Sequence, residues 1–185
     1  MNVDLPPEGA APDVPVAAPA WFPHGLWSAK LAVQRFVLVA TGAIVTILIF
    51  VQVVTRYIFA PSIFGIEEAA SFLAIWLYFV GGAYGAYDRG HISASLVDLV
   101  VRSDRVRQVV KAFVAALTVI LSAWMTLWAI RYFLATLQRG AMSLELGIQM
   151  AWVHAGIPIG LALMTFYFAL ELLEDLGKLR SGARR

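Results

Sequence analysis

Four long apolar runs, each nearly free of charge at its centre, constrain this chain more than any other feature of its sequence. A run of about 20 apolar residues has the length that crosses the hydrocarbon core of a bilayer as a helix. The composition agrees, because 61% of the residues are hydrophobic and only 14% are charged. We therefore predict an all-α integral membrane protein with four transmembrane helices, over about residues 31–55, 66–87, 109–134 and 150–173.

Two adjacent acids, Glu67 and Glu68, open the second of these runs. Negative charge suits the start of a helix, because the first backbone amides are unpaired there and the helix dipole is positive. A metal or proton site is the alternative, but neighbouring residues of a helix point about 100° apart. We predict that the two acids form a cap or a partner contact at the outer face of the membrane, with Arg56 as the nearest basic residue.

The second run ends at Arg89 and His91, which flank a glycine. A cation fits the negative end of the helix dipole, and a glycine can adopt the left-handed capping conformation. We therefore predict a cytoplasmic stop at Arg89 and His91. From Ile92 onward the apolar residues recur with a helical period, which predicts a short amphipathic helix on the membrane surface between the second and third spans. A simple continuation of the second helix is the alternative.

The two ends of the chain lie outside the apolar runs. Residues 1–25 contain six of the eight prolines and no basic residue, which predicts a disordered cytoplasmic tail. A proline-rich partner motif is the alternative for this segment. Residues 26–176 form the predicted four-helix membrane domain, and residues 177–185 form a basic cytoplasmic tail.

The basic residues predict the orientation of the chain in the membrane. Eleven of the fourteen lysines and arginines fall in or beside the two termini and the middle loop, whereas Arg56, Arg131 and Arg139 fall on the opposite side. Loops rich in lysine and arginine face the cytoplasm. Both termini and the middle loop are therefore predicted to be cytoplasmic.

The second helix divides into a face of small residues and a face of bulky ones. The bulky face is predicted to meet lipid or a partner protein, and it contains Phe72, Trp76 and Phe79. In the fourth span Pro158 predicts a kink between two glycines. Small residues let helices approach closely in lipid, so we assign six of them to the packing of a compact bundle. These residues are Ser71, Gly81, Gly82, Gly85, Gly156 and Gly160.

Chemistry-bearing residues are sparse in this chain. Cysteine is absent, and no nucleophile with a base, phosphate-binding loop or metal-ligand spacing is present. Pumps and channels usually place ionisable groups in the middle of their helices, where this chain has almost none. We predict that the chain is not an enzyme, that it holds no metal or cofactor, and that it does not bind nucleic acid. The pattern favours a subunit that works through a larger assembly.

His154 is the one histidine inside a predicted span, close to its outer end. A haem ligand at this position would make the chain the membrane anchor of a redox enzyme. A bis-histidine site needs a second histidine at matching depth, however, and His24 and His91 lie toward the cytoplasmic end. We favour a hydrogen-bonded histidine at the interface. An independent small channel or exporter is a further alternative.

Several short motifs occur in the order in which a known family has them. They are RY at Arg56 and Tyr57, EE at Glu67 and Glu68, Trp76, the pair Gly81 and Gly82, GHI at Gly90 to Ile92, Ser143 and Leu144, Trp152, and IPIG at Ile157 to Gly160. In these features, over about residues 31–173, the chain resembles the small membrane subunit of the TRAP (tripartite ATP-independent periplasmic) transporters, the DctQ-like family.

This resemblance implies a role in transport. In the family, a periplasmic binding protein captures an organic anion, often a carboxylate, and delivers it to a small and a large membrane subunit. The large subunit carries the sodium and substrate sites, and the small one is its scaffold and takes part in docking the binding protein. The resemblance thus implies sodium-coupled secondary active uptake of organic acids across the bacterial inner membrane. The implied partners are the large subunit, the binding protein and membrane lipids.

Overall fold

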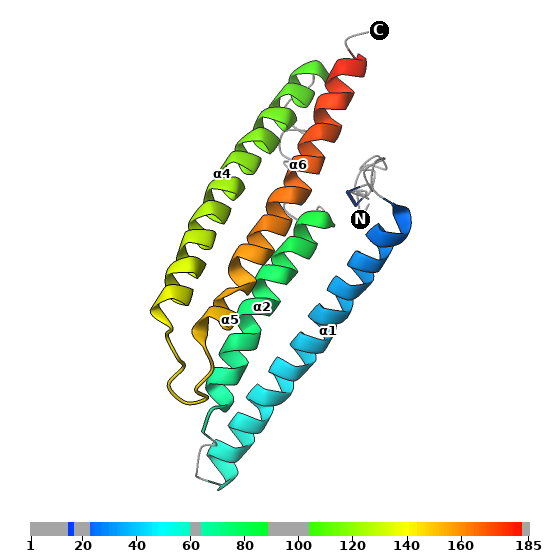
Figure 1. Ribbon diagram of the computed structural model, residues 1–185. Helices are drawn as coiled ribbons and strands as arrows, with labels where there is room; N and C mark the ends of the chain where they lie inside the picture. The colour runs from blue at the N-terminus through cyan, green and yellow to red at the C-terminus, as the bar shows by residue number, and fades with distance from the viewer. Residues whose placement is uncertain (1–14, 17–22, 60–63, 89–103, 183–185) are drawn as a thin grey trace, which may run out of the picture.

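The computed structural model describes residues 15–16, 23–59, 64–88 and 104–182 (Figure 1). These residues form helices joined by short connections, and the described part of the chain contains no strand beyond one isolated bridge. The elements are α1 (His24–Val54), the π-helical turn η1 (Thr55–Phe59), α2 (Ile66–Tyr87), α4 (Asp104–Arg139), α5 (Met150–His154) and α6 (Gly156–Gly182). Four segments are long and apolar enough to cross a membrane: Gly25–Ile58, Ile66–Tyr87, Gln108–Arg139 and Met150–Gly177. The predicted all-α membrane fold is confirmed.

The helices extend beyond the apolar runs from which they were predicted. α1 begins at His24 rather than near residue 31, and α4 reaches from Asp104 to Arg139. Hydropathy marks the part of a helix that lies in hydrocarbon, whereas the helix itself continues through the polar interface. The amphipathic helix predicted after Ile92, together with Arg89 and His91, lies outside the described residues, and so does most of the predicted N-terminal tail, whereas residues 177–182 of the predicted C-terminal tail continue α6.

The four long helices pack side by side in the order α4, α6, α2 and α1 (Figure 1). α4 packs against α6, α6 against α2, and α2 against α1, so α1 and α4 lie at opposite edges. The prediction of a compact bundle was therefore wrong. Lipid does not drive apolar helices together as water does, so an edge helix can leave most of its apolar surface uncovered.

The contact between α2 and α6 places large side chains of one helix against glycines of the other. A Cβ atom added to Gly156 would lie 3.0 Å from the Trp76 ring, and one added to Gly160 would lie 2.5 Å from the Phe79 Cβ atom. The Trp76 ring thus fills the space beside Gly156, whereas at Gly160 it is the backbone and Cβ atom of Phe79 that approach closely. The assignment of Trp76 to a face that meets lipid or a partner was wrong, because its ring packs on α6, and the same assignment of Phe79 stays a prediction. Phe72 is half-buried, and its partner assignment stays a prediction.

The small residues of α2 divide into those at helix contacts and those outside them. A Cβ atom on Gly81 would lie 3.5 Å from Leu38 of α1, and one on Gly82 would lie 3.4 Å from Met164 of α6. A Cβ atom on Gly85 would meet nothing within 4 Å. Ser71 is exposed, and its hydroxyl donates to a backbone carbonyl of its own helix. The prediction that Gly85 and Ser71 pack helices was therefore wrong within this chain.

Pro158 interrupts the last membrane span, as its chemistry requires. Proline has no backbone N–H, so it cannot bond the carbonyl one turn earlier, which belongs to His154. The helix is broken at this point into α5, which ends at His154, and α6, which begins at Gly156.

A buried polar chain joins three helices near the end that carries the termini. Tyr167 of α6 is fully buried, and its hydroxyl donates to Gln34 Oε1 of α1 over 3.2 Å. Gln34 Nε2 in turn donates to the carbonyl of Val80 in α2 over 3.1 Å. The Gln34 amide is therefore held by both neighbouring helices, which fixes the register of α1.

We expect the Tyr167–Gln34 bond to stabilise the fold measurably. Hydrogen bonds between membrane helices contribute on average about 0.6 kcal/mol and at most about 1.7 kcal/mol. A double-mutant cycle of Tyr167→Phe and Gln34→Ala, read from unfolding in mixed micelles, should give a coupling free energy in this range. Tyr78→Phe on the exposed face of α2 is the control, and it should leave the stability unchanged. A coupling of zero would contradict the assignment.

Candidate partner-binding site

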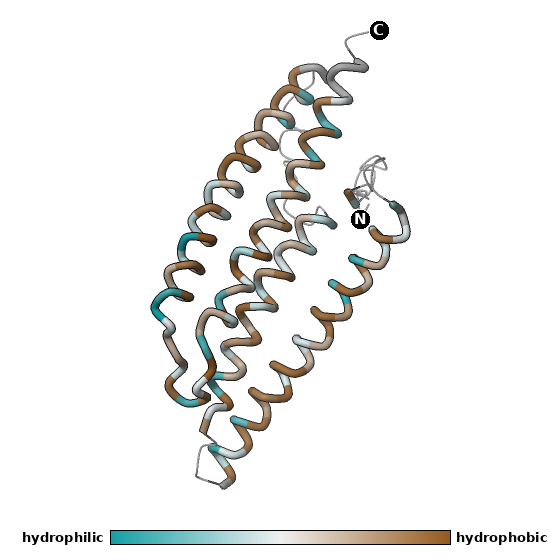
Figure 2. The backbone as a smooth tube through the Cα atoms, in the orientation of Figure 1, coloured by the Kyte–Doolittle hydropathy of each residue, from teal (hydrophilic) through white to brown (hydrophobic). Residues whose placement is uncertain are grey.

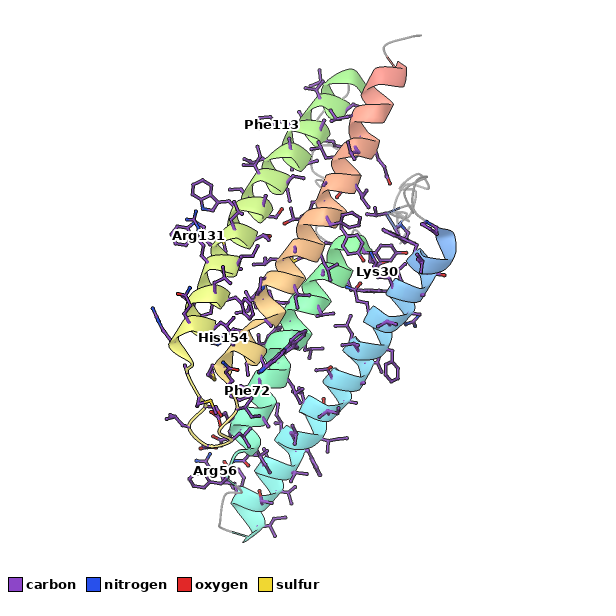
Figure 3. All side chains as sticks on the ribbon, viewed as in Figure 1. Lys30, Arg56, Phe72, Phe113, Arg131 and His154 are labelled. Atoms are coloured by element: carbon purple, nitrogen blue, oxygen red, sulfur yellow. The ribbon has the colours of Figure 1, made fainter. Side chains whose placement is uncertain are left out.

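Arg56, Glu67 and Glu68 meet at the end of the molecule opposite the termini (Figures 1 and 3). Three segments converge there: the end of α1 with η1, the start of α2, and the connection between α4 and α5 at residues 140–149, called here the α4–α5 loop. The two acids therefore lie at the start of α2, between the end of α1 and the α4–α5 loop.

Glu68 holds the α4–α5 loop through three consecutive backbone amides. Its carboxylate accepts hydrogen bonds from the N–H groups of Leu144 at 3.1 Å, Glu145 at 3.0 Å and Leu146 at 2.8 Å. Successive amides that converge on one point form a concave site for an anion. Here the anion is a side chain of the same protein, so Glu68 is a loop anchor. It makes no cap of its own helix, which begins after Gly65 without any side-chain capping bond.

A second carboxylate also joins the loop to α2, but here the acceptor belongs to the loop and the donor lies at the start of α2. Glu145 of the α4–α5 loop accepts a hydrogen bond over 2.8 Å from the backbone N–H of Gly65, just before α2. Gly65 has a φ of 85°, and a Cβ atom there would lie 2.7 Å from a methyl carbon of Leu146. Only glycine meets both conditions without strain. The loop and the start of α2 are thus joined by two reciprocal carboxylate–amide contacts.

The α4–α5 loop is also ordered internally, as a miniature hairpin. Met142 and Gln149 form an antiparallel bridge, and the Ser143 N–H donates to the carbonyl of Ile148 over 2.8 Å. The Ser143 hydroxyl accepts from the Ile148 N–H. Gly140 and Gly147 turn the chain with φ values of 59° and 63°. The loop therefore presents one defined surface.

Glu67 turns toward α1 instead of toward the loop. Gln52 Nε2 donates to Glu67 Oε1 over 2.8 Å, and an Arg56 guanidinium nitrogen lies 3.8 Å from the same oxygen. Both charged side chains are about two-thirds exposed, so the ion pair contributes little to stability. The Gln52 bond is the firmer link, and the sequence alone gave no sign of it.

Exposed apolar residues surround this polar junction. Leu144 at the tip of the loop is 99% exposed, and Phe64 before α2 is 83% exposed. Tyr57 of η1 and Trp152 of α5 are also largely exposed. A rigid, polar junction with apolar side chains around it has the anatomy of a protein-binding surface, in which aromatic residues are enriched.

His154 is the last residue of α5 and lies away from this junction, where its ring faces α4 (Figure 3). Its ring packs against the ring of Tyr132, with 5.1 Å between centroids, and its Nδ1 atom is buried without a hydrogen-bond partner among the described residues. The described residues contain no group of three or more histidine, cysteine, aspartate or glutamate side chains that could hold a metal ion.

Four helices in a row, each long and apolar enough to cross a membrane, with one ordered polar junction, define a multi-pass membrane protein. The chain belongs to the family of tripartite ATP-independent periplasmic transporters, DctQ component, whose model matches residues 45–178. This match runs from the middle of α1 into α6 and includes the whole junction. A comparison with curated proteins found no match.

Membership of this family sets the general role of the chain. It is the small component of a TRAP transporter, and the family is one of transporter components, not of enzymes. A tripartite system implies a large membrane subunit and a substrate-binding protein as partners.

Proposed function

We propose that this chain is the membrane scaffold of the large transport subunit in sodium-coupled, binding-protein-dependent uptake of organic anions such as carboxylates. The observation that carries the proposal is the row of helices with two uncovered edges. α1 packs on α2 and reaches α6 only near the end that carries the termini, and α4 packs on the last span alone, so the outer face of each edge helix remains to hold another membrane protein. The sodium coupling and the substrate class follow from the family resemblance.

The edge formed by α4 is the more suitable of the two for a large partner. Its exposed residues recur at helical spacing along one side and include two tryptophans, and hydrophobic residues recur along most of α4 in Figure 2. Large aromatic side chains dominate protein interfaces. The residues of this stripe are Phe113, Leu117, Ile120, Leu121, Trp124 and Trp128. We propose this stripe as the main contact with the large subunit.

The α4–α5 loop fits the second partner, the substrate-binding protein. Under the orientation predicted from the basic residues, both termini are cytoplasmic and the loop faces the periplasm of a bacterial inner membrane. Its exposed Leu144 lies on a hairpin that Glu68 holds in one position. We propose that this rigid tip helps to dock the binding protein.

The absence of cysteine from the chain makes the scaffold proposal directly testable. Trp124→Cys is expected to form a disulfide with single cysteines introduced into the large subunit, whereas Phe50→Cys on the opposite edge should not. The tagged chain should also recover the large subunit in mild detergent, and uptake in proteoliposomes should need both subunits and the binding protein. Uptake by this chain alone, or crosslinks from Phe50→Cys only, would contradict the proposal.

A further inference from the structure

An open groove of about 490 Å³ lies between α1 and α2, near the end of the molecule that carries the termini. α1 contributes one face of a helix to it, and α2 contributes two tyrosines whose rings pack together with 5.7 Å between centroids. The lining residues are Leu31, Ala32, Arg35, Phe36, Val39, Tyr84 and Tyr87. The groove is thus lined mainly by apolar side chains, and Arg35 is the one lining residue with a formal charge.

Arg35 carries that charge, and no acidic residue in the described part of the chain pairs with it. It is exposed, and it forms no ion pair with any residue that the structure describes. An arginine inside a membrane span is costly unless it pairs with an anion or reaches the headgroups. Side chains of a helix lean toward its N-terminus, so Arg35 leans toward the end of α1 that carries the chain terminus.

Lys30 lies one turn earlier on α1 and is placed differently. Its ammonium group lies 4.0 Å from the centroid of the Trp27 ring and 4.4 Å from that of Tyr167, so it is held inside the chain by aromatic faces (Figure 3). Such contacts stabilise a cation without any carboxylate. The two cations therefore have separate roles: Lys30 stabilises the packing of α1, whereas Arg35 faces the groove and pairs with no acid among residues 15–16, 23–59, 64–88 and 104–182.

We propose that the groove binds one anionic phospholipid from the leaflet on the side of the termini. Guanidinium and phosphate match in geometry and form paired, charge-assisted hydrogen bonds. With the phosphate at Arg35, one acyl chain runs along Phe36 and Val39 toward the middle of the membrane, which is the direction that a lipid in this leaflet must take. The tyrosines Tyr84 and Tyr87 suit the boundary between headgroup and hydrocarbon. The site depends on the fold and on membrane insertion, and it is independent of the transport role.

Lipid retention measured by native mass spectrometry tests the headgroup. The full-length chain, in the assembly in which it is purified, is titrated with phosphatidylglycerol or with phosphatidylcholine. One basic residue near an anionic lipid contributes about a fivefold change in affinity. Arg35→Gln should therefore weaken phosphatidylglycerol binding about fivefold and weaken phosphatidylcholine binding less, because the choline cation offsets the charge of the phosphate. Lys111→Gln, an exposed cation on α4 near the same end, is the matched control and should change neither.

A second pair of variants tests the groove itself. Ala32 lines the groove and is exposed, so Ala32→Trp should fill the space and weaken the binding of both lipids, whereas Ala32→Ser should not. If Arg35→Gln lowers the yield, Arg35→Lys keeps the charge and should keep the preference for phosphatidylglycerol. Equal losses in Arg35→Gln and Lys111→Gln, or no loss in Ala32→Trp, would overturn the proposal.

The identity of the occupant is tested by photochemical crosslinking. A photoreactive phenylalanine analogue in place of Phe36 should form an adduct with phosphatidylglycerol, and the adduct should decrease when Arg35→Gln is added. A crosslink from this position to a protein would show that the groove is covered by a partner subunit, and it would overturn the proposal.

Discussion

Gly160→Leu is expected to prevent the packing of α2 on α6 and to reduce the recovery of folded protein severely. A Cβ atom at this position would lie 2.5 Å from the Phe79 Cβ atom and 2.6 Å from both the carbonyl carbon and the carbonyl oxygen of Phe79. Two of these atoms belong to the backbone, so a change of rotamer cannot relieve the clash. Overpacking a core costs about 1–3 kcal/mol, and we expect the upper end of this range or more. Unfolding in mixed micelles measures the loss.

Gly85→Leu is the matched control, because it is the same substitution in a helix of the same domain. A Cβ atom at Gly85 meets nothing within 4 Å, so the variant should fold with nearly unchanged stability. Equal losses from Gly85→Leu and Gly160→Leu would contradict the packing described above.

Compensating substitutions separate a clash with side-chain atoms from a clash with the backbone. Gly156→Ala would press on the Trp76 ring, 3.0–3.3 Å away, so adding Trp76→Leu should restore stability. Adding Phe79→Ala to Gly160→Ala should not restore stability, because the Cβ, carbonyl carbon and carbonyl oxygen atoms that clash are present in alanine as well.

The sequence predicted the helices well and their contacts poorly, and Trp76 and Phe79 show why. A helix of about 20 apolar residues is long enough to cross a bilayer whatever helices surround it, so the four spans could be predicted from the sequence alone. Which face of a helix packs depends on the surface of its neighbour. The glycines of α6 offer a smooth surface, on which the Trp76 ring packs at Gly156 and the backbone of α2 approaches at Gly160. The size pattern of α2 alone suggested the opposite arrangement.

The sequence predicted where Glu67 and Glu68 lie, but it did not predict the groups to which they bond. Local rules place acids at the start of a helix, and Glu67 and Glu68 do lie there. Their partners lie far along the chain or on another helix: Glu68 bonds amides of the α4–α5 loop, and Glu67 bonds Gln52. No periodicity connects such segments, so only the fold brings them together.

Glu68→Gln is expected to release the α4–α5 loop and to lower uptake more than it lowers expression. The carboxylate offers two acceptor oxygens to three N–H donors, whereas an amide replaces one oxygen with an NH₂ group that must oppose a donor. Charge-assisted bonds are also about twice as strong as neutral ones. Hydrogen exchange across residues 140–149 should therefore become faster by about tenfold or more, because protection reports local opening.

Glu67→Gln is the control for this effect, since the neighbouring acid has the same charge but bonds Gln52 and not the loop. It should leave exchange in the α4–α5 loop unchanged. Glu68→Asp, which keeps the charge on a shorter side chain, should give an intermediate rate because its oxygens cannot reach all three amides.

If the Glu68 anchor serves to present a rigid tip to the substrate-binding protein, uptake should fall in the same order as protection is lost: least in Glu67→Gln, more in Glu68→Asp and most in Glu68→Gln. Loss of protection in Glu68→Gln with uptake unchanged would show that the anchor holds the fold but takes no part in docking.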